Sequence, residues 1–267
     1  MENYVEQNPA SKVFDDQISK SKFYTQIFLY FGLGILLTAV VCLVVSWAFN
    51  SIWPISQVID GVLVLNEETL MTYTVLTVVS AVALLIISFV ITFKSLRGKG
   101  SILVPYVLYA ILMGVLLSSF TFYVGDTYII GEALLITALL FLGMCGIGYL
   151  THNKLATWTK VVIGFSIALI LFSLLNLVFI PFVIFGGNWA AFEGYAITYL
   201  ITEGIIFLLF LVMTAYDMAR IRTIAERGYG SKNLALYCAL NLYSDFITIF
   251  IYVLRILITI AASSKRN

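Results

Sequence analysis

Two aspartates stand out because each lies at or inside a long apolar run. Asp217 closes one such run, directly after Thr214-Ala215-Tyr216, and Asp245 lies well inside the last run. An ionisable side chain at membrane depth costs roughly 2.5–3.5 kcal/mol on insertion scales, so it persists where it pairs or lines a watery path. Two carboxylates in close contact cannot both ionise cheaply, and they then share one proton. If the fold brings the two side chains together, they form a proton-sensitive site.

Asp245 is accompanied by other polar residues on its own predicted helix. Asn241 lies four residues before it, Thr248 three after and Tyr252 seven after, spacings that place all four on one helical face. Arg255, ten residues further on, lies within about 80° of that face. A lipid-facing helix would not tolerate such a stripe, so we expect a central helix surrounded by the others. The alternative is a structural hydrogen-bond network of Asp245 with Arg255 or Asn241.

Further carboxylates extend the polar pattern along the chain. Glu203 and Asp217 are 14 residues apart, about four helical turns, and therefore share a face. Glu132 begins another apolar run. Such a ladder would suit a cation path, because hard cations such as Ca²⁺ prefer oxygen ligands. The alternative is that Glu132 and Glu203 are interfacial helix-end residues, and that Asp217 forms an interfacial ion pair with Arg220 or Arg222.

Membrane-spanning helices must position these residues. The chain has 267 residues, of which 61% are hydrophobic and 11% charged, with a mean hydropathy of +1.03. Soluble domains are nearer ~25% charged, so the composition excludes a soluble, disordered or nucleic-acid-binding protein. Helices are expected because an open sheet cannot satisfy its backbone in lipid. We predict an all-α membrane protein with seven transmembrane helices: Phe23–Ala48, Leu70–Phe93, Ile102–Val124, Tyr128–Leu150, Thr159–Phe185, Ala196–Tyr216 and Leu234–Ala262.

The charges outside these runs predict the domain organisation and the orientation. Residues 1–22 form a polar tail, and residues 23–267 form a single seven-helix membrane domain. Basic residues gather in the tail and in every second loop, so the positive-inside rule places the N-terminus in the cytoplasm. These loop residues are Lys94, Arg97, Lys99, Lys154, Lys160, Arg220, Arg222, Arg227 and Lys232.

Other residue types with reactive side chains are scarce. Cys42, Cys145 and Cys238 all fall in apolar stretches and are interpreted as packing residues. His152 is the single histidine and lies in a loop, which excludes a histidine-rich metal cage and weakens any Ser-His or Cys-His nucleophile. We therefore expect no enzyme, no resident cofactor and no nucleic-acid partner. The expected partners are the lipid bilayer, calcium and protons, and the sequence names no protein partner.

The last two runs carry a specific motif. It comprises Ala215-Tyr216-Asp217-Met218-Ala219-Arg220-Ile221, then Ala239-Leu240-Asn241-Leu242-Tyr243-Ser244-Asp245-Phe246-Ile247, then Leu254-Arg255-Ile256-Leu257. With Ala133, Thr137-Ala138, Phe141 and Gly148-Tyr149-Leu150-Thr151 along and at the end of the fourth run, it resembles the Bax inhibitor-1 family, in particular its bacterial members. The resemblance implies a pH-sensitive calcium leak pathway and a seventh helix wrapped by the other six. It also implies that Asp217 and Asp245 are the pH sensor. When the pair ionises, its freed oxygens are expected to attract calcium transiently. The short tails and the absence of sorting signals fit a bacterial inner membrane.

Three other functions stay open at this point. A non-conducting regulatory or scaffold membrane protein would carry no flux by itself, and a proton-coupled transporter would show saturable solute uptake. An intramembrane aspartyl protease also has Tyr-Asp on one helix, as in Tyr216-Asp217. However, such a protease needs Gly-x-Gly-Asp at its second aspartate, whereas Asp245 follows Leu242-Tyr243-Ser244.

Overall fold

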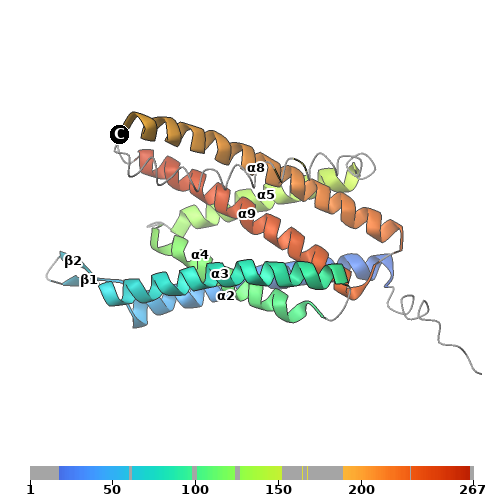
Figure 1. Ribbon diagram of the computed structural model, residues 1–267, viewed down its shortest axis with the longest axis horizontal. Helices are drawn as coiled ribbons and strands as arrows, with labels where there is room; N and C mark the ends of the chain where they lie inside the picture. Colours follow the sequence, from blue (N-terminus) through green and yellow to red (C-terminus); the bar gives the residue numbers. More distant parts are fainter. Residues whose placement is uncertain are drawn as a thin grey trace, which may run out of the picture. The chain divides into compact units, whose positions relative to one another are not determined.

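The computed structural model describes residues 18–59, 62–97, 101–123, 127–151, 164, 167, 189–228 and 230–264 (Figure 1). This part is almost entirely helical, as predicted. In chain order the elements are α2 (Lys20–Trp47), the π-helix η1 (Ala48–Ile52), β1 (Ser56–Ile59), β2 (Val62–Leu65), α3 (Glu67–Arg97), α4 (Leu103–Tyr123), α5 (Thr127–Leu150), α8 (Trp189–Glu226) and α9 (Lys232–Ser264).

Six helices of the described part are long and apolar enough to cross a membrane. They correspond to six of the seven predicted spans. The remaining span, Thr159–Phe185, falls outside the described residues, so the count of seven stays a prediction. The largest difference concerns α8, which continues ten residues beyond the predicted end at Tyr216. The apolar run ends there, but the backbone hydrogen bonds of the helix do not require apolar side chains and continue to Glu226.

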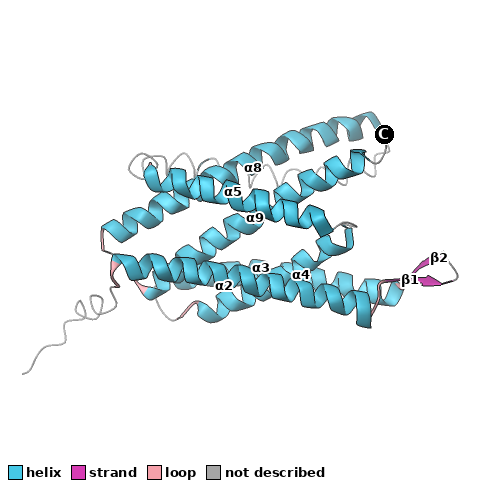
Figure 2. Ribbon diagram, turned by 180° about the vertical axis from the view of Figure 1, so that it is seen from behind, coloured by secondary structure: helices cyan, strands magenta, loops and turns pink. Residues whose placement is uncertain are grey.

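A short antiparallel hairpin lies between η1 and α3, where the sequence analysis predicted no regular structure. The register pairs Ser56 with Leu65 and Ile59 with Val62. Figure 2 shows β1 and β2 beyond the adjoining ends of α2 and α3. The signal was present in the sequence, because the dipeptide Asp60-Gly61 between two stretches rich in β-branched residues is a strong hairpin indicator.

Polar side chains define several helix ends. At the start of α3, the Asn66 side-chain oxygen accepts a hydrogen bond from the backbone N–H of Thr69 at 3.2 Å. Ser231 accepts from the backbone N–H of Leu234 at 3.3 Å at the start of α9. These bonds satisfy N–H groups that have no partner within the helix. After α8, Gly228 adopts a φ of 73°, a left-handed conformation that ends a helix and suits glycine.

The helices assemble into two compact units. Unit 1 comprises Met1–Gly131 and Ala225–Tyr243, and unit 2 comprises Glu132–Ile224 and Ser244–Asn267. Helices α5, α8 and α9 contribute to both units, so a unit boundary crosses each of these continuous helices. The single membrane domain of residues 23–267 stays a prediction.

In unit 1, α4 packs against both α2 and α3, and the three helices lie side by side in Figures 1 and 2. Buried hydroxyls join these helices to the first part of α9. Thr38 donates to the carbonyl of Ala110 at 3.0 Å, and its hydroxyl lies 2.5 Å from that of Tyr243. Tyr106 donates to the carbonyl of Tyr30 at 2.7 Å, and its ring packs edge-on against Tyr243. Each of these hydroxyls has a polar partner, as burial in an apolar environment requires.

Candidate functional site

Asp217 lies in the interior of α8 and not at its end. Because the helix runs on to Glu226, the carboxyl group is nine residues from the helix terminus and only 8% exposed. The charge of Arg220 acts on it electrostatically from one turn further along α8. Asp217 therefore does not end its helix, although the apolar run ends there, and its position relative to the membrane interface stays a prediction.

Asp245 lies on α9 within the same unit as Asp217. It is 7% exposed, and its carboxyl group hydrogen-bonds the hydroxyl of Thr214, one turn before Asp217 on α8. The charge of Asp217 acts directly on Asp245. The Oδ2 atom of Asp245 is buried and lacks a hydrogen-bond partner, which is unusual for a carboxylate oxygen. The fold thus brings two buried carboxyl groups, on adjacent helices, within electrostatic range of each other.

Helix α5 forms a third side of this site. The charges of both Asp217 and Asp245 act on the buried thiol of Cys145, so all three side chains share one region of unit 2. One turn further along, Gly148 lies against the backbone of Ala215 on α8, and a Cβ atom at this glycine would collide with the Ala215 carbonyl. A small residue is required here because the two backbones approach closely.

Arg222 attaches the last turns of α8 to the end of α5. Its guanidinium group lies 4.4 Å from the centroid of the Tyr149 ring and donates a hydrogen bond to the Tyr149 carbonyl. Cation–π contact and hydrogen bonding together hold the two helices next to the close approach at Gly148. Arg222 and Tyr149 therefore join α5 and α8 at the helix ends that the sequence analysis placed next to basic loops.

Towards the other end of α5, an aromatic pair lies beside the carboxylates. Phe141 packs edge-on against Phe246 of α9, with ring centroids 5.4 Å apart, and both rings are buried. Phe141 lies one turn before Cys145 and one turn after Thr137, so the three side chains share one face of α5. The Thr137 hydroxyl is fully buried and has no hydrogen-bond partner. Phe141 thus lies one turn from a buried hydroxyl without a partner, and Phe246 directly follows Asp245, whose Oδ2 also lacks one.

The predicted polar stripe of α9 divides between the two units. Asn241 is half-buried within unit 1. In unit 2, the Thr248 hydroxyl donates to the backbone carbonyl of Ser244 at 2.8 Å, a bond within its own helix. Tyr252 is half-buried, with its ring beside those of two phenylalanines of α8, Phe207 and Phe210. The central position of this helix stays a prediction.

The charged residues predicted for a cation path occupy different environments. Arg255 forms an ion pair with Glu203, in which its Nη1 lies 2.6 Å from Oε1 and 2.7 Å from Oε2. Glu132 is exposed on α5. Since Glu203 is bonded to Arg255, its charge is compensated locally, whereas Asp217 and Asp245 act on each other. No group of three His, Cys, Asp or Glu side chains that could hold a metal ion occurs among the described residues.

Sequence reasoning missed three residues of the site. Thr214 was noted only as a neighbour of Asp217, although its position at i−3 places it on the same face of α8. Cys145 was interpreted as packing alone. Phe141 was noted only as part of the family resemblance and was given no role, because nothing in the sequence pairs it with Phe246.

Comparison with known proteins gives a consistent result along the chain. The family model described as Inhibitor of apoptosis-promoting Bax1 matches residues 20–263. The inner membrane protein YbhL of Escherichia coli (strain K12) is 29% identical over 242 residues, covering 88% of this chain and 90% of that protein. A membrane protein of Streptococcus pyogenes serotype M3 is 26% identical, covering 90% of this chain and 93% of that protein. The protein YrjE of Lactococcus lactis is 26% identical, covering 93% and 96%.

Proposed function

The chain belongs to the Bax inhibitor-1 family of multi-pass membrane proteins, and from this premise we propose that it is a pH-sensitive cation leak channel that conducts calcium. In this proposal Asp217 and Asp245 form the pH sensor and gate, and they bind calcium transiently as it passes. The bacterial inner membrane is the proposed location, in keeping with the name of the Escherichia coli relative.

One observation carries the proposal. Two carboxyl groups are buried on adjacent helices of one unit, and the charge of one acts on the other. Two negative charges so placed repel each other strongly, because the surroundings screen them much less than water does. A single shared proton removes the repulsion. The pair therefore couples proton concentration to the force between α8 and α9.

The sign of the pH dependence follows from this coupling. At low pH the proton-bound pair lets α8 and α9 stay in contact, which is the closed form. As the pH rises, the proton leaves, the carboxylates repel each other and the helices separate into the open form. Because the closed form binds more protons than the open form, it is favoured below the midpoint and lost above it. The released oxygens are hard ligands suited to calcium.

The hydrogen bonds of Thr214, including the one to its own backbone in α8, would change with the protonation state of Asp245. Its hydroxyl has one proton, which it donates to the carbonyl of Phe210 at 2.9 Å. With that proton engaged, Thr214 accepts a bond from a protonated Asp245. When Asp245 ionises, the hydroxyl turns its proton to the carboxylate and releases the carbonyl. While the helices are still in contact, each protonation state of Asp245 thus keeps one hydrogen bond to Thr214 but reverses its direction, and the bond is lost when the helices separate.

Phe141 and Phe246 would form the apolar barrier of the closed form. Their edge-on contact lies beside Asp245 on one side and along the α5 face from Thr137 on the other. An apolar constriction excludes water and therefore blocks a hydrated cation without any charged group. Separation of α8 and α9 would draw Phe246 away from Phe141, which would connect the two unpartnered oxygens through water.

Calcium flux through the purified protein tests the proposal. The full chain is reconstituted into liposomes that contain a calcium-sensitive dye, and uptake is followed between pH 5 and pH 8. We expect uptake to rise with pH and to lose this dependence in Asp217→Asn and Asp245→Asn. Absence of flux at every pH would favour the non-conducting regulatory protein. Saturable uptake of a small solute driven by a proton gradient would favour a transporter, and cleavage of a transmembrane substrate would favour the protease.

A further inference from the structure

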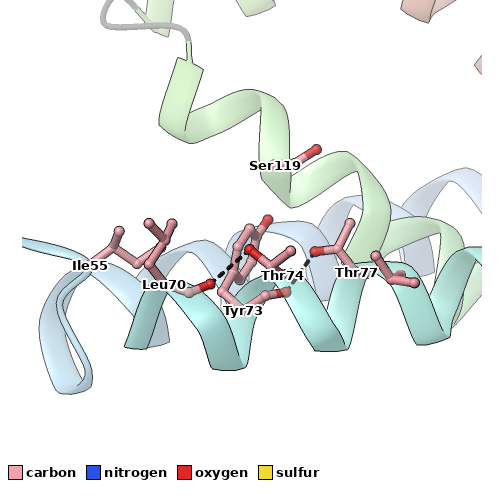
Figure 3. A pocket seen from close by; sticks show the side chains of 7 residues that line it. Ile55, Leu70, Tyr73, Thr74, Thr77 and Ser119 are labelled. Carbon is pink, nitrogen blue, oxygen red and sulfur yellow. Dashed lines mark hydrogen bonds between the residues drawn. The ribbon is translucent and has the colours of Figure 1, made fainter. Parts of the chain in front are cut away.

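A cavity of about 250 Å³ lies within unit 1. Its wall is formed by α3, by Ser119 of α4 and by Ile55 before the hairpin (Figure 3). On α3 the lining residues are Leu70, Tyr73, Thr74, Thr77 and Val78. Val78 is 56% exposed, so the cavity opens onto the outer surface of a membrane-spanning helix. The cavity is smaller than pockets that enclose a whole small ligand, which measure roughly 300–1,000 Å³, so it is suited to one part of a larger ligand.

The hydroxyl groups of the wall do not offer their protons to a guest. Thr74 donates to the carbonyl of Leu70 at 2.8 Å, and Thr77 donates to that of Tyr73 at 2.9 Å, as Figure 3 shows. Ser119 donates to the Leu116 carbonyl at 2.6 Å. The Tyr73 hydroxyl lies 2.8 Å from that of Ser118. A polar solute would find these donors already engaged, whereas an apolar chain requires none.

The depth of the cavity is that of acyl chains in one leaflet. Trp47 and Trp53 are both about 60% exposed at the neighbouring helix ends, the pattern of aromatic side chains at a membrane interface. From Glu67 at the start of α3, the residues from Leu70 to Val78 lie about 5 to 17 Å along the helix axis. Half of a hydrocarbon core measures about 15 Å. With the start of α3 placed at the interface, the cavity would extend from just below the interface to about the middle of the bilayer.

The first turn of α3, before the cavity, is acidic. Glu67 and Glu68 are exposed there, and no Lys or Arg occurs between residues 50 and 69. Neither lines the cavity, but Glu67, three residues before Leu70 and seven before Thr74, lies on the same face of α3 as the lining residues, whereas Glu68 does not. A carboxylate at headgroup level attracts an ammonium group and repels a headgroup with net negative charge.

We propose that this cavity binds one acyl chain of a glycerophospholipid with an ammonium-bearing headgroup, with the headgroup held at Glu67. The site shares no residue with the proposed cation path and does not depend on it. Phosphatidylethanolamine is the probe for this site, and phosphatidylglycerol with identical chains is the anionic competitor.

Native mass spectrometry of the full-length protein with an equimolar mixture of the two lipids tests the proposal. We expect at least threefold more bound phosphatidylethanolamine than phosphatidylglycerol. Thr74→Phe fills the cavity and should reduce retained lipid about fivefold. Thr72→Phe is the matched control, because Thr72 is also exposed, donates to its own helix at 2.9 Å and does not line the cavity. Equal retention by both variants would overturn the site.

Two further measurements keep the proposal testable if Thr74→Phe folds poorly. Phosphatidylethanolamine with a photoreactive group in its acyl chain should label the wild-type protein mainly between residues 70 and 78. Labelling spread evenly over the apolar surfaces of α2, α3 and α4 would overturn the site. Glu67→Gln should still bind lipid but lose the headgroup preference, whereas Glu68→Gln, on the other face of α3, should keep it. An unchanged preference in Glu67→Gln, or none in the wild type, would overturn the role of Glu67.

Discussion

Arg255 of α9 donates from its Nη1 to both carboxylate oxygens of Glu203 on α8, at 2.6 and 2.7 Å. The ion pair joins the same two helices as Asp217 and Asp245, and the order of these contacts along the chain shows that α8 and α9 are antiparallel within unit 2. About half of the Arg255 side chain is exposed, whereas both aspartates are buried. The α8–α9 contact therefore has one position where an ion pair compensates its own charges, at Arg255 and Glu203, and another where two negative charges act on each other, at Asp217 and Asp245.

The first prediction concerns the aspartates. Asp217→Asn removes one of the two repelling charges, so calcium flux should stay at its low-pH level across the whole pH range. In the wild type, exchange of one proton should spread the change from 1% to 99% open over about four pH units. Glu226→Gln, at the exposed end of α8, is the control and should keep the wild-type profile. A wild-type pH response in both Asp217→Asn and Asp245→Asn would exclude the sensor role.

The second prediction concerns Thr214. Thr214→Val keeps the shape of the side chain but removes the donor that stabilises ionised Asp245. The bond to ionised Asp245 contributes about 1.5–3 kcal/mol and the bond from protonated Asp245 about 0.5–1.5 kcal/mol, so the midpoint of calcium flux should move up by about one pH unit. Thr223→Val is the matched control, because Thr223 donates only to the Ala219 carbonyl of its own helix. Equal midpoints in the two variants would contradict the proposed relay.

The third prediction concerns the aromatic barrier. Phe141→Ala should raise calcium flux at low pH, because water can then fill the space beside Asp245. The same change should destabilise the protein by about 3–5 kcal/mol, so Phe141→Leu provides a milder variant with a smaller rise. Phe89→Leu, at a ring that is 65% exposed on α3, is the control. Low-pH flux equal to that of the wild type in both Phe141 variants would disprove the barrier.

The fourth prediction concerns the ion pair. A double-mutant cycle of Glu203→Gln and Arg255→Gln should give a coupling free energy of about 0.5–1 kcal/mol in unfolding measurements, since the pair is partly exposed. The coupling should weaken at high salt. Strictly additive effects at low salt would show that the two side chains do not stabilise each other.

The fifth prediction concerns helix packing. Gly148→Ala introduces a Cβ atom against the Ala215 carbonyl, which belongs to the backbone and cannot rotate away. We expect a loss of about 1–3 kcal/mol in the free energy of unfolding. Gly146→Ala is the control, because nothing lies within 4 Å of a Cβ atom there and alanine favours the helix. Equal stability of the two variants would show that α5 and α8 can separate at this position without loss.

The hairpin and the length of α8 mark where the sequence analysis fell short of the fold. The spans were located from uninterrupted apolar runs. This criterion does not detect that a helix can continue beyond its apolar part. For α8 this placed Asp217 at an end, when it lies nine residues inside. The hairpin was not predicted, because the loop between the first two spans was interpreted from its charges and not from its Asp60-Gly61 turn sequence.

The sequence by itself determined the membrane class, the six long apolar helices of the described residues, and the two aspartates as ionisable residues that are energetically costly at membrane depth. These properties depend on the composition and length of local segments, and the bilayer acts on each segment independently. Tertiary structure decided which groups meet: Arg255 with Glu203, Thr214 with Asp245 and Phe141 with Phe246. Each of these contacts joins residues at least 31 positions apart on different helices. Such contacts depend on the rotation and offset of whole helices, which a periodicity within one helix does not specify.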